Sequence, residues 1–381
     1  EAEQCNADID PGLTPVIAAG GIVYATQSSD STLYAGTSAE YNTTLAATWS
    51  SRQEYKNMNL HRDVDTEDIE TLTGSTLSNT LDQLGVNDAY AYGFSGNGVT
   101  ININDSSLCQ TFPDLVGKTI TTFGTVSEPS SFSHGCHVAT TAVAKYDNNA
   151  SDTLTGFGSP YENLTYSMMG VAYNSDLHFS QNSGDGSVCS GGASDTDCWG
   201  PQHWELALED AKVKGAKVSS NSWGFDDDLY ATTVSTWASS NDKTIYEALV
   251  HFQSQTGVDG DSGGGCSGGA CTEIGLYTSG TPNWTTTEWI EYISSIDSFQ
   301  ETGIYLSAAS NDNNGTMSTV WSSANKADTS SSLPYLFPEL NEAWISVVNV
   351  ISLEDGTRAL FSSACAVNAA WCLSHDGYEI M

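Results

Sequence analysis

The stretch HWELALEDAKVKGAKVSSNSWG, residues 203–224, decides the fold of this chain. Its first half places apolar residues every three or four positions up to Lys214, which predicts an amphipathic helix. Gly215 ends that helix, and residues 216–224 predict a strand that runs into a turn. A helix, a glycine and a strand in this order are typical of one repeat of a βαβ structure.

The same order returns further along the chain. Residues 284–302 predict a helix, Gly303 its end, and residues 304–309 another strand. Residues 98–105 and 344–351 predict two more buried strands. The expected fold is therefore α/β, a mainly parallel sheet with helices on both faces.

The part of the chain before this pattern has a different composition. Residues 1–85 are rich in Thr, Ser, Asn and Ala, which favours an N-terminal extension that wraps around the main domain. Residues 86–381 are the expected main domain, and residues 225–283 interrupt it as a long insert. Inserts of this kind in a compact domain are usually functional loops.

The composition is strongly acidic. Among 381 residues, 47 are Asp or Glu and 11 are Lys or Arg, so the formal net charge is −36. This charge repels phosphate backbones and anionic membrane surfaces, so no nucleic acid is expected as a partner. Solubility in salty surroundings is the preferred explanation of the acidity. No apolar run reaches the roughly 18 residues of a membrane span, so we expect no membrane-spanning segment here.

Nine cysteines favour disulfides over zinc, because the Gly/Ser-rich loops that hold several of them have no histidine at metal-ligand spacing. Cys5 is left over, so its partner is open. Disulfides indicate an oxidising compartment, either secreted or at the cell surface. The N-terminus lacks a basic region and an apolar core, so we expect that a signal peptide has been removed. The expected bonds join Cys189 with Cys198, Cys266 with Cys271, Cys365 with Cys372 and, as a further pair that flanks the candidate site, Cys109 with Cys136.

Polar side chains follow several of the expected strands. Asp105 and Asn311 each stand at the end of one strand, and Ser222, Trp223 and Gly224 follow another. The carboxyl ends of parallel strands meet at one edge of a sheet, where ligands bind in folds of this class. We therefore expect these residues to line one crevice.

His134 completes the candidate site, because it opens a run of small apolar residues that predicts a helix packed tightly on the sheet. A serine hydroxyl becomes a nucleophile when an imidazole accepts its proton, and a carboxylate on the far ring nitrogen fixes the tautomer. An amide that donates to the developing oxyanion contributes about 3–4 kcal/mol to transition-state stabilisation. His134, Asp105 and Asn311 are the candidates for these three roles.

The chain resembles the subtilisin-like serine proteases, and most of all their autotransporter-type members. The matching blocks, in the family's order, are GVTININDSS at 98–107, HGCHVA at 134–139, NSWG at 221–224, ASND at 309–312, and the stretches 338–340, 344–347 and 361–373. Ser107, Cys136 and Ser310 stand where the family usually has Gly, Thr and Gly. The resemblance implies a subtilisin-like fold, with residues 222–224 along the substrate cleft.

One family block is missing. No serine after Asn311 stands in a Gly-Thr-Ser-Met-type segment, so the resemblance places the nucleophile beyond Met381. We therefore expect a domain truncated at its C-terminus, a fragment that is inactive alone and has the remaining C-terminal part of the same protein as its partner. A bacterial source is also expected from the resemblance.

The expected function is that of an extracellular serine endopeptidase acting on proteins or peptides. The alternative is a protease-like surface or assembly scaffold protein that is inactive or cleaves only itself. No organic cofactor is implied. The acidic groups at 226–228 and at Asp259 and Asp261 offer oxygen ligands for calcium, but a solvated acidic loop is the preferred interpretation, and no metal site is assigned.

Overall fold

The structure is a computed structural model, and it describes residues 14–18, 21–25, 41–52, 54–55, 80–129, 133–146, 152–153, 165–166, 169–182, 200–223, 240–243, 286–309, 331, 333–352, 358–360, 362, 365 and 370–376. The strands are β1 (Thr14–Ala18), β2 (Gly21–Ala25), β3 (Thr100–Asp105), β4 (Ile120–Phe123), β5 (Asp152–Thr153), β6 (Thr165–Tyr166), β7 (Asp176–Gln181), β8 (Ala216–Asn221), β9 (Ile304–Ala308), β10 (Trp344–Ser352), β11 (Arg358–Leu360) and β12 (Cys372–Asp376). The helices are α1 (Thr43–Ser51), α4 (Thr80–Gln83), α5 (Val86–Ala91), α6 (His134–Val143), α7 (Pro201–Val213), α10 (Thr286–Gln300), α11 (Leu333–Leu336) and the 3₁₀-helix η5 (Pro338–Asn341).

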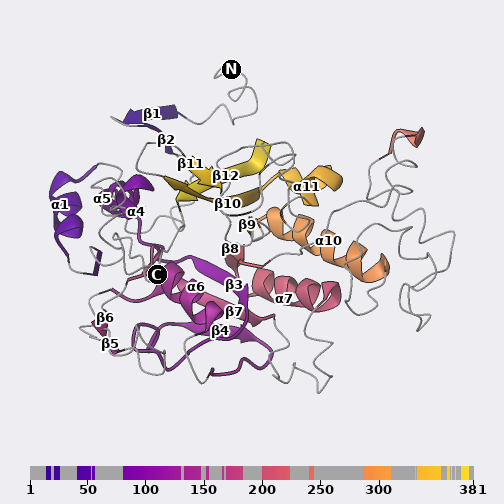
Figure 1. Cartoon of the computed structure of the whole chain (residues 1–381), viewed down its shortest axis with the longest axis horizontal. Helices are drawn as coiled ribbons and strands as arrows, with labels where there is room; N and C mark the ends of the chain where they lie inside the picture. The colour runs from indigo at the N-terminus through magenta and orange to yellow at the C-terminus, as the bar shows by residue number, and fades with distance from the viewer. Residues whose placement is uncertain are drawn as a thin grey trace.

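An eight-stranded sheet forms the centre of the molecule (Figure 1). Its strands follow the order β11–β10–β9–β8–β3–β7–β4, and β12 pairs with β10 beside that path. The pairings are parallel except for that of β10 with β11. The predicted mainly parallel sheet is confirmed.

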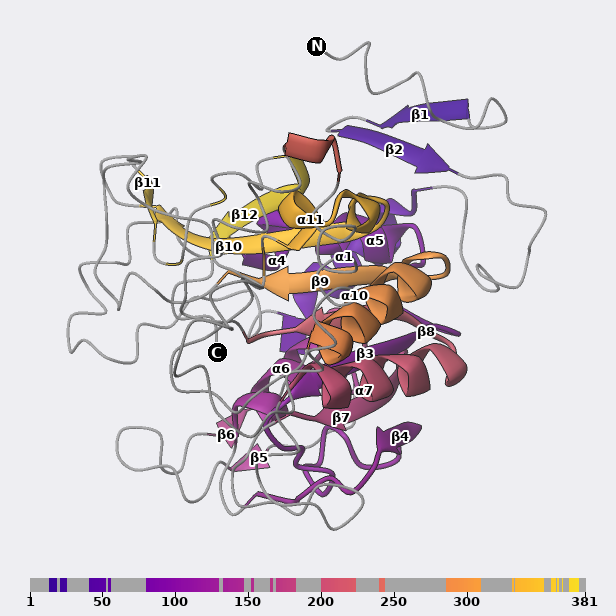
Figure 2. The same ribbon diagram turned by 90° about the vertical axis from the view of Figure 1, so that its right-hand side faces the viewer.

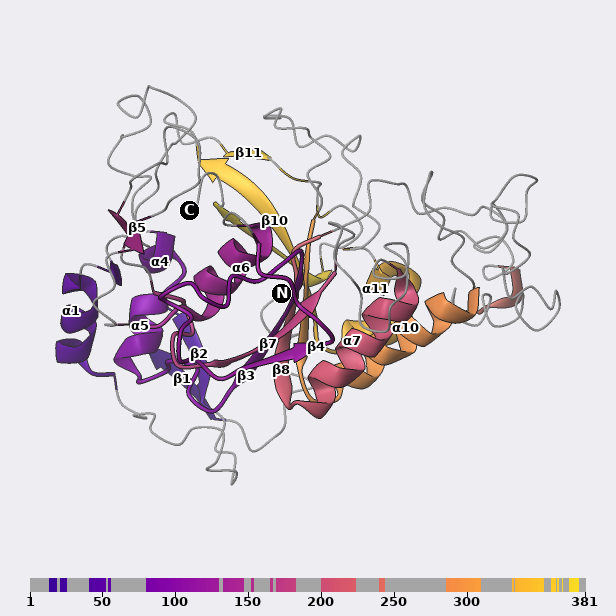
Figure 3. The ribbon, with the colours of Figure 1, turned by 90° about the horizontal axis from the view of Figure 1, so that it is seen from below.

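The helices cover both faces of this sheet, as predicted (Figure 3). On one face, α6 packs on β3 and β7 through a cluster that includes Ile103, Ala139 and Phe179. On the other face, α7 and α10 lie side by side against β8, β9 and β10 (Figure 2). Trp204 of α7 and Tyr292 of α10 belong to the large aromatic cluster there.

The repeat that starts at residue 203 in the sequence forms α7 and β8. The helix begins at Pro201, two residues earlier than predicted, because proline suits the first turn of a helix, where its missing N–H is not needed. Gly215 follows the helix at φ 81°, a left-handed conformation that ends helices and favours glycine. The chain then enters β8 directly.

Four strands of the sheet, β4, β7, β11 and β12, were not among those predicted. β7 lies between β3 and β4, next to the strand that carries Asp105. Its sequence alternates Leu177 and Phe179, which face α6, with His178 and Ser180, which are buried on the other face. A strand with buried polar residues lacks the continuous apolar run by which a buried strand is recognised.

Residues 41–55 attach to the main domain through aromatic contacts. Trp49 of α1 lies against Tyr90 of α5, with ring centroids 4.8 Å apart, and against Tyr173, 5.0 Å apart. The Arg52 guanidinium lies 5.2 Å from the ring centroid of Trp49, in cation–π range. In the part of the chain that the structure describes, no helix is both long and apolar enough to cross a bilayer.

Candidate active site

The candidate site lies at the carboxyl edge of the sheet, where β3 stands between β7 and β8. The register aligns Asp105 with Gln181 of β7, and Asn104 with Asn221 of β8. The chain thus brings the ends of three parallel strands together at one edge, as expected for a ligand site in this fold class. Asp105 is the last residue of the central strand.

Asp105 and His134 form a hydrogen-bonded pair at this edge. The Nδ1–H of His134 donates to Oδ1 of Asp105 at 2.8 Å and to Oδ2 at 3.0 Å. The Asp105 side chain is 3% exposed, whereas that of His134 is 59% exposed. Because the carboxylate holds the proton on Nδ1, the neutral ring carries its lone pair on Nε2, where a hydroxyl proton can be accepted.

The pair also changes the basicity of the imidazole. The hydrogen bond to Asp105 raises the pKa of His134 above its ordinary value. Burial of the ring lowers this pKa, and the negative charge of Asp105 raises it. A buried carboxylate stabilises the imidazolium that forms when the ring takes up a proton. The arrangement therefore supports a general base.

The segment after Asp105 is joined to the start of α6 residue by residue. The Ser106 N–H donates to Asp105 Oδ1 at 2.7 Å, and the Gly135 N–H donates to Ser106 Oγ at 3.0 Å. Ser133 caps α6 by accepting the Cys136 N–H at 3.3 Å, and its hydroxyl donates to the Ser107 carbonyl at 2.9 Å. These contacts hold the acid and the base at a defined separation.

Gly135 makes this close contact sterically feasible. A Cβ added at Gly135 would lie 2.5 Å from the Ser107 carbonyl oxygen and 3.1 Å from the Phe179 ring. Real Cβ atoms essentially never approach backbone that closely. The glycine after His134 is therefore required for packing of α6 against the segment that follows β3.

A disulfide joins the same two segments. Cys109 and Cys136 are bonded, with their Cα atoms 5.4 Å apart, so this suggested pair is present. The predicted bond between Cys365 and Cys372 is present as well, with the Cα atoms 5.9 Å apart.

The structure does not place the remaining five cysteines, so the other two expected bonds stay predictions. The expected bond of Cys189 with Cys198 lies outside the described residues. The expected bond of Cys266 with Cys271 lies outside them too, and so does Cys5.

The other predicted site residues are described only in part. Ser222 and Trp223 directly follow β8 at the carboxyl edge and are half-buried. The Trp223 ring packs against Trp204, with ring centroids 4.5 Å apart, so one side of it joins the aromatic cluster. Gly224 and Asn311 lie outside the described residues, so the structure does not place them.

Several residues around the pair were not predicted. The Oε1 atom of Gln181 accepts hydrogen bonds from the Ser127 N–H at 2.7 Å and from its hydroxyl at 3.0 Å. The Gln181 carbonyl accepts one from Nε2 of His203 at 2.8 Å. Gln181 thus ties the segment that leads to α6 to the end of β7. Its position at the end of the alternating stretch 176–181 is the signal that could have identified it.

His137 stands one helical turn after His134 on α6. Its Nε2 atom is buried and has no hydrogen-bond partner in the described structure. Burial lowers the pKa of His137, the neighbouring His134 lowers it further, and Asp105 opposes both. The lowered pKa favours the neutral form of His137, and the structural role expected for it stays a prediction.

The described part of the chain contains no cluster of three or more His, Cys, Asp or Glu side chains able to hold a metal ion. The acidic groups at 226–228 and at Asp259 and Asp261 lie outside the described residues.

The chain was compared with protein-family models and with solved structures. A family model described as the subtilase family matches residues 96–380. Among solved structures, the chain is similar to the prenylagaramide maturation protease PagA, with 14% identity, a TM-score of 0.41, and coverage of 77% of this chain and 68% of that one.

Two further structures are similar at the same level. The psychrophilic subtilisin-like protease Apa1 from the Antarctic psychrotroph Pseudoalteromonas sp. AS-11 has 15% identity, a TM-score of 0.39, and coverage of 75% of this chain and 42% of that one. The self-cleaved protease domain of PatA has 14% identity, a TM-score of 0.37, and coverage of 74% and 69%. No curated protein sequence matches the chain.

Proposed function

Because the chain belongs to the subtilase family, we propose that it is the part of a serine endopeptidase that carries the catalytic acid and base. The observation that supports this most directly is the hydrogen bond between buried Asp105 and exposed His134 at the carboxyl edge of the sheet. An orienting acid on one side of an imidazole, with the other side accessible, is the arrangement that activates a hydroxyl.

In the proposed reaction, Nε2 of His134 takes the proton of a serine hydroxyl as that oxygen attacks the peptide carbonyl. Asp105 keeps the ring in the correct tautomer and stabilises the imidazolium. The same imidazolium then donates its proton to the leaving amine. Asn311 is the proposed donor to the oxyanion, and residues 222–224 are the proposed binding strand for the substrate chain.

The nucleophile in this proposal is a serine outside residues 1–381. This part of the proposal rests on the sequence after Asn311, in which Ser362, Ser363 and Ser374 all stand outside a Gly-Thr-Ser-Met-type segment. The chain alone is then inactive, and its partner is the segment that carries this serine. The substrate is a protein or peptide, and the mechanism needs no cofactor.

The proposed location is outside the cell. Two disulfides among the described residues, Cys109–Cys136 and Cys365–Cys372, favour an oxidising compartment. The acidic composition favours a salty medium. A bacterial, autotransporter-type protein is the corresponding proposal for the source.

A second candidate is a surface or assembly scaffold that keeps the protease fold and is inactive or cleaves only itself. The strongly acidic composition and the odd number of cysteines, which leaves Cys5 over, favour it. The two candidates differ in one measurable property, because only the enzyme places an activated serine beside His134.

A fluorophosphonate probe distinguishes them, since it reacts with activated serines. In the full-length protein we expect the probe to label one serine beyond residue 381, and the substitution His134→Ala to abolish labelling. His203→Ala is the matched control, because His203 contacts the Gln181 carbonyl and not Asp105; it should still be labelled. Labelling that persists in His134→Ala refutes the assignment, and the absence of labelling in the unmodified protein supports the scaffold.

A further inference from the structure

We propose that the Cys109–Cys136 disulfide positions the Asp105–His134 pair, and that its main contribution is to the alignment of acid and base. This inference rests on the proposed function in so far as the pair is taken to be catalytic. The bond itself and its effect on His134 can be tested without any enzymatic activity.

The position of the bridge is the first argument. Cys109 lies on the segment that follows Asp105, and Cys136 lies on α6 just after His134. The hydrogen bond between Asp105 and His134 joins the two segments at one end, and the disulfide joins them at the other. The contact of Ser106 with Gly135 lies between these ends, and the contact of Ser107 with Ser133 joins the same two segments just before His134.

These connections form a closed ring, so the two segments cannot slide along one another without breaking several of them. A hydrogen bond in an exposed position can exchange with water, whereas a covalent bond cannot. The His134 side chain is more than half exposed, so the fold does not enclose the ring, and its hydrogen bond to buried Asp105 orients it. A covalent link close to the pair reduces the freedom of the two segments that carry these residues.

The burial of the bridge is the second argument. Cys136 is 0% exposed and Cys109 is 8% exposed, and both belong to the cluster that packs α6 on the sheet. The Cys109 N–H also donates to Sγ of Cys136 at 2.8 Å. The bridge is therefore part of the packed layer beneath the pair. A shift of either cysteine moves the backbone segment that contains Asp105 or His134.

The second disulfide offers a matched control. Cys365 and Cys372 are bonded beside β10 and β12, and β8 and β9 separate β10 from β3 in the sheet. They pack in a different cluster, with Ala309 and Val348. Removing this bridge changes the covalent structure of the chain at a distance from Asp105 and His134.

The test compares two double variants by NMR titration of histidine-labelled protein, one with Cys109→Ala and Cys136→Ala, the other with Cys365→Ala and Cys372→Ala. The hydrogen bond to Asp105 is the largest cause of the raised pKa of His134. A loosened pair should therefore bring this pKa down toward the ordinary value of about 6.5. We expect a fall of about half a unit or more without the first bridge, and no change without the second.

In the full-length protein, the same substitutions should separate kcat from KM. The loss of Cys109–Cys136 should lower kcat about tenfold and leave KM unchanged within about twofold, because alignment acts on the chemical step. A bridge that only stabilised the fold would lower the melting temperature and leave both the His134 titration and kcat unchanged.

Three results overturn the proposal. The first is a His134 titration that is the same in both double variants, and the second is reaction of Cys109 and Cys136 as free thiols in the unreduced protein. The third is failure to fold of both the double alanine and the double serine variant at Cys109 and Cys136 while the control folds, because the bridge then serves stability. The probe experiment on the serine is independent, so failure of the proposed function is distinguished from failure of this inference.

Discussion

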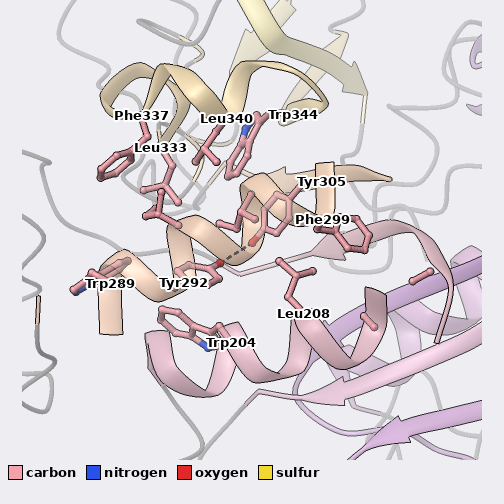
Figure 4. Packing of buried hydrophobic residues seen from close by; sticks show 14 residues of the cluster. Trp204, Leu208, Trp289, Tyr292, Phe299, Tyr305, Leu333, Phe337, Leu340 and Trp344 are labelled. Carbon is pink, nitrogen blue, oxygen red and sulfur yellow. Dashed lines mark hydrogen bonds between the residues drawn. The ribbon is translucent and has the colours of Figure 1, made fainter. Parts of the chain in front are cut away.

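The two faces of the sheet are packed with different kinds of side chain. On one face, α6 contributes small residues such as Gly135, Cys136 and Ala139, and the helix comes close enough to the segment after β3 that a Cβ at Gly135 would meet backbone. Under α7 and α10, the contacts are made by large aromatic rings, among them Trp204 and Tyr292 (Figure 4).

The difference follows from what each face does. Burial of a large aromatic side chain removes much apolar surface from water, which stabilises the fold. Small side chains contribute less burial but allow backbone segments to approach closely, which fixes relative positions. The face under α6 holds the Asp105–His134 pair and serves placement, whereas the face under α7 and α10 serves stability.

The aromatic face also contains buried polar groups, which are paired across strands. The amide of Asn102 donates to Ser219 Oγ at 2.9 Å, and that of Asn221 donates to the Leu306 carbonyl at 3.1 Å. Tyr292 and Tyr305 share a hydrogen bond of 2.7 Å between their hydroxyls (Figure 4). Buried polar groups lower the stability of the fold unless they are hydrogen-bonded. These hydrogen bonds offset the cost of burying the polar side chains on this face.

The largest effect on stability is expected from the aromatic face. Trp204 is 1% exposed, and Trp204→Ala should lower the free energy of unfolding by about 4 kcal/mol, because it leaves a large cavity. Urea denaturation measures this loss. Leu206→Ala on the same helix is the control: Leu206 is 45% exposed, and its removal should cost less than about 0.5 kcal/mol. Equal losses would contradict the assignment of stability to the buried aromatic cluster.

The next effect is a dependence of stability on pH that arises from His178. Burial lowers the pKa of His178 to about 4, although Asp210, with Oδ2 at 3.6 Å from Nε2, favours the charged form and Lys214 disfavours it. The Nδ1 atom is paired with the Thr121 hydroxyl at 2.9 Å. As the pH falls below about 6.5, the unfolded chain binds a proton at this position that the folded chain does not yet bind.

Stability should therefore fall on acidification between about pH 6.5 and pH 4, by roughly 3 kcal/mol in total from this one group. The free energy of unfolding of His178→Gln, measured at several pH values, should depend less on pH across this interval. His203→Gln is the comparison, because the hydrogen bond to the Gln181 carbonyl opposes the lowering of the pKa of His203 by burial. The prediction is wrong if His178→Gln leaves the dependence on pH unchanged.

The smallest effect on stability is expected from substitution of Gly135, and the sign of the change in stability is what the experiment tests. Helix propensity alone predicts that Gly135→Ala stabilises α6 by about 1 kcal/mol. The contact of the added Cβ with the Ser107 carbonyl predicts the opposite, a loss of about 2 kcal/mol from overpacking. Thermal unfolding decides between them, and a stabilised variant would show that the approach of α6 to this segment is not limited by the glycine.

Much of the framework could be predicted from the sequence. The helix and strand before and after Gly215 follow from hydrophobic periodicity and from glycine at a helix end, which are local properties. Asp105 and His134 could be paired in advance because each stands at the end of an element that the sheet brings to one edge.

Other parts depend on contacts that the sequence does not display. β7 was missed because His178 and Ser180 interrupt its apolar pattern, and their burial makes sense only with partners on β4 and β3. Ser106 and Ser133 are common polar residues whose roles at the site arise from the approach of α6. Gln181 likewise acquires its role from the segment that packs beside it.

The order in which contacts can form during synthesis follows from the distances along the chain. Asp105 and His134 are 29 residues apart, whereas the contact between Asn102 and Ser219 at the centre of the sheet joins residues 117 apart. Closing the shorter loop costs about 1 kcal/mol less entropy. The acid and the base can thus meet while later strands are still being made, and a hydroxyl supplied from elsewhere would arrive last. In the proposed enzyme, a nascent chain built in this order would gain the ability to cut peptides only at the end of its assembly.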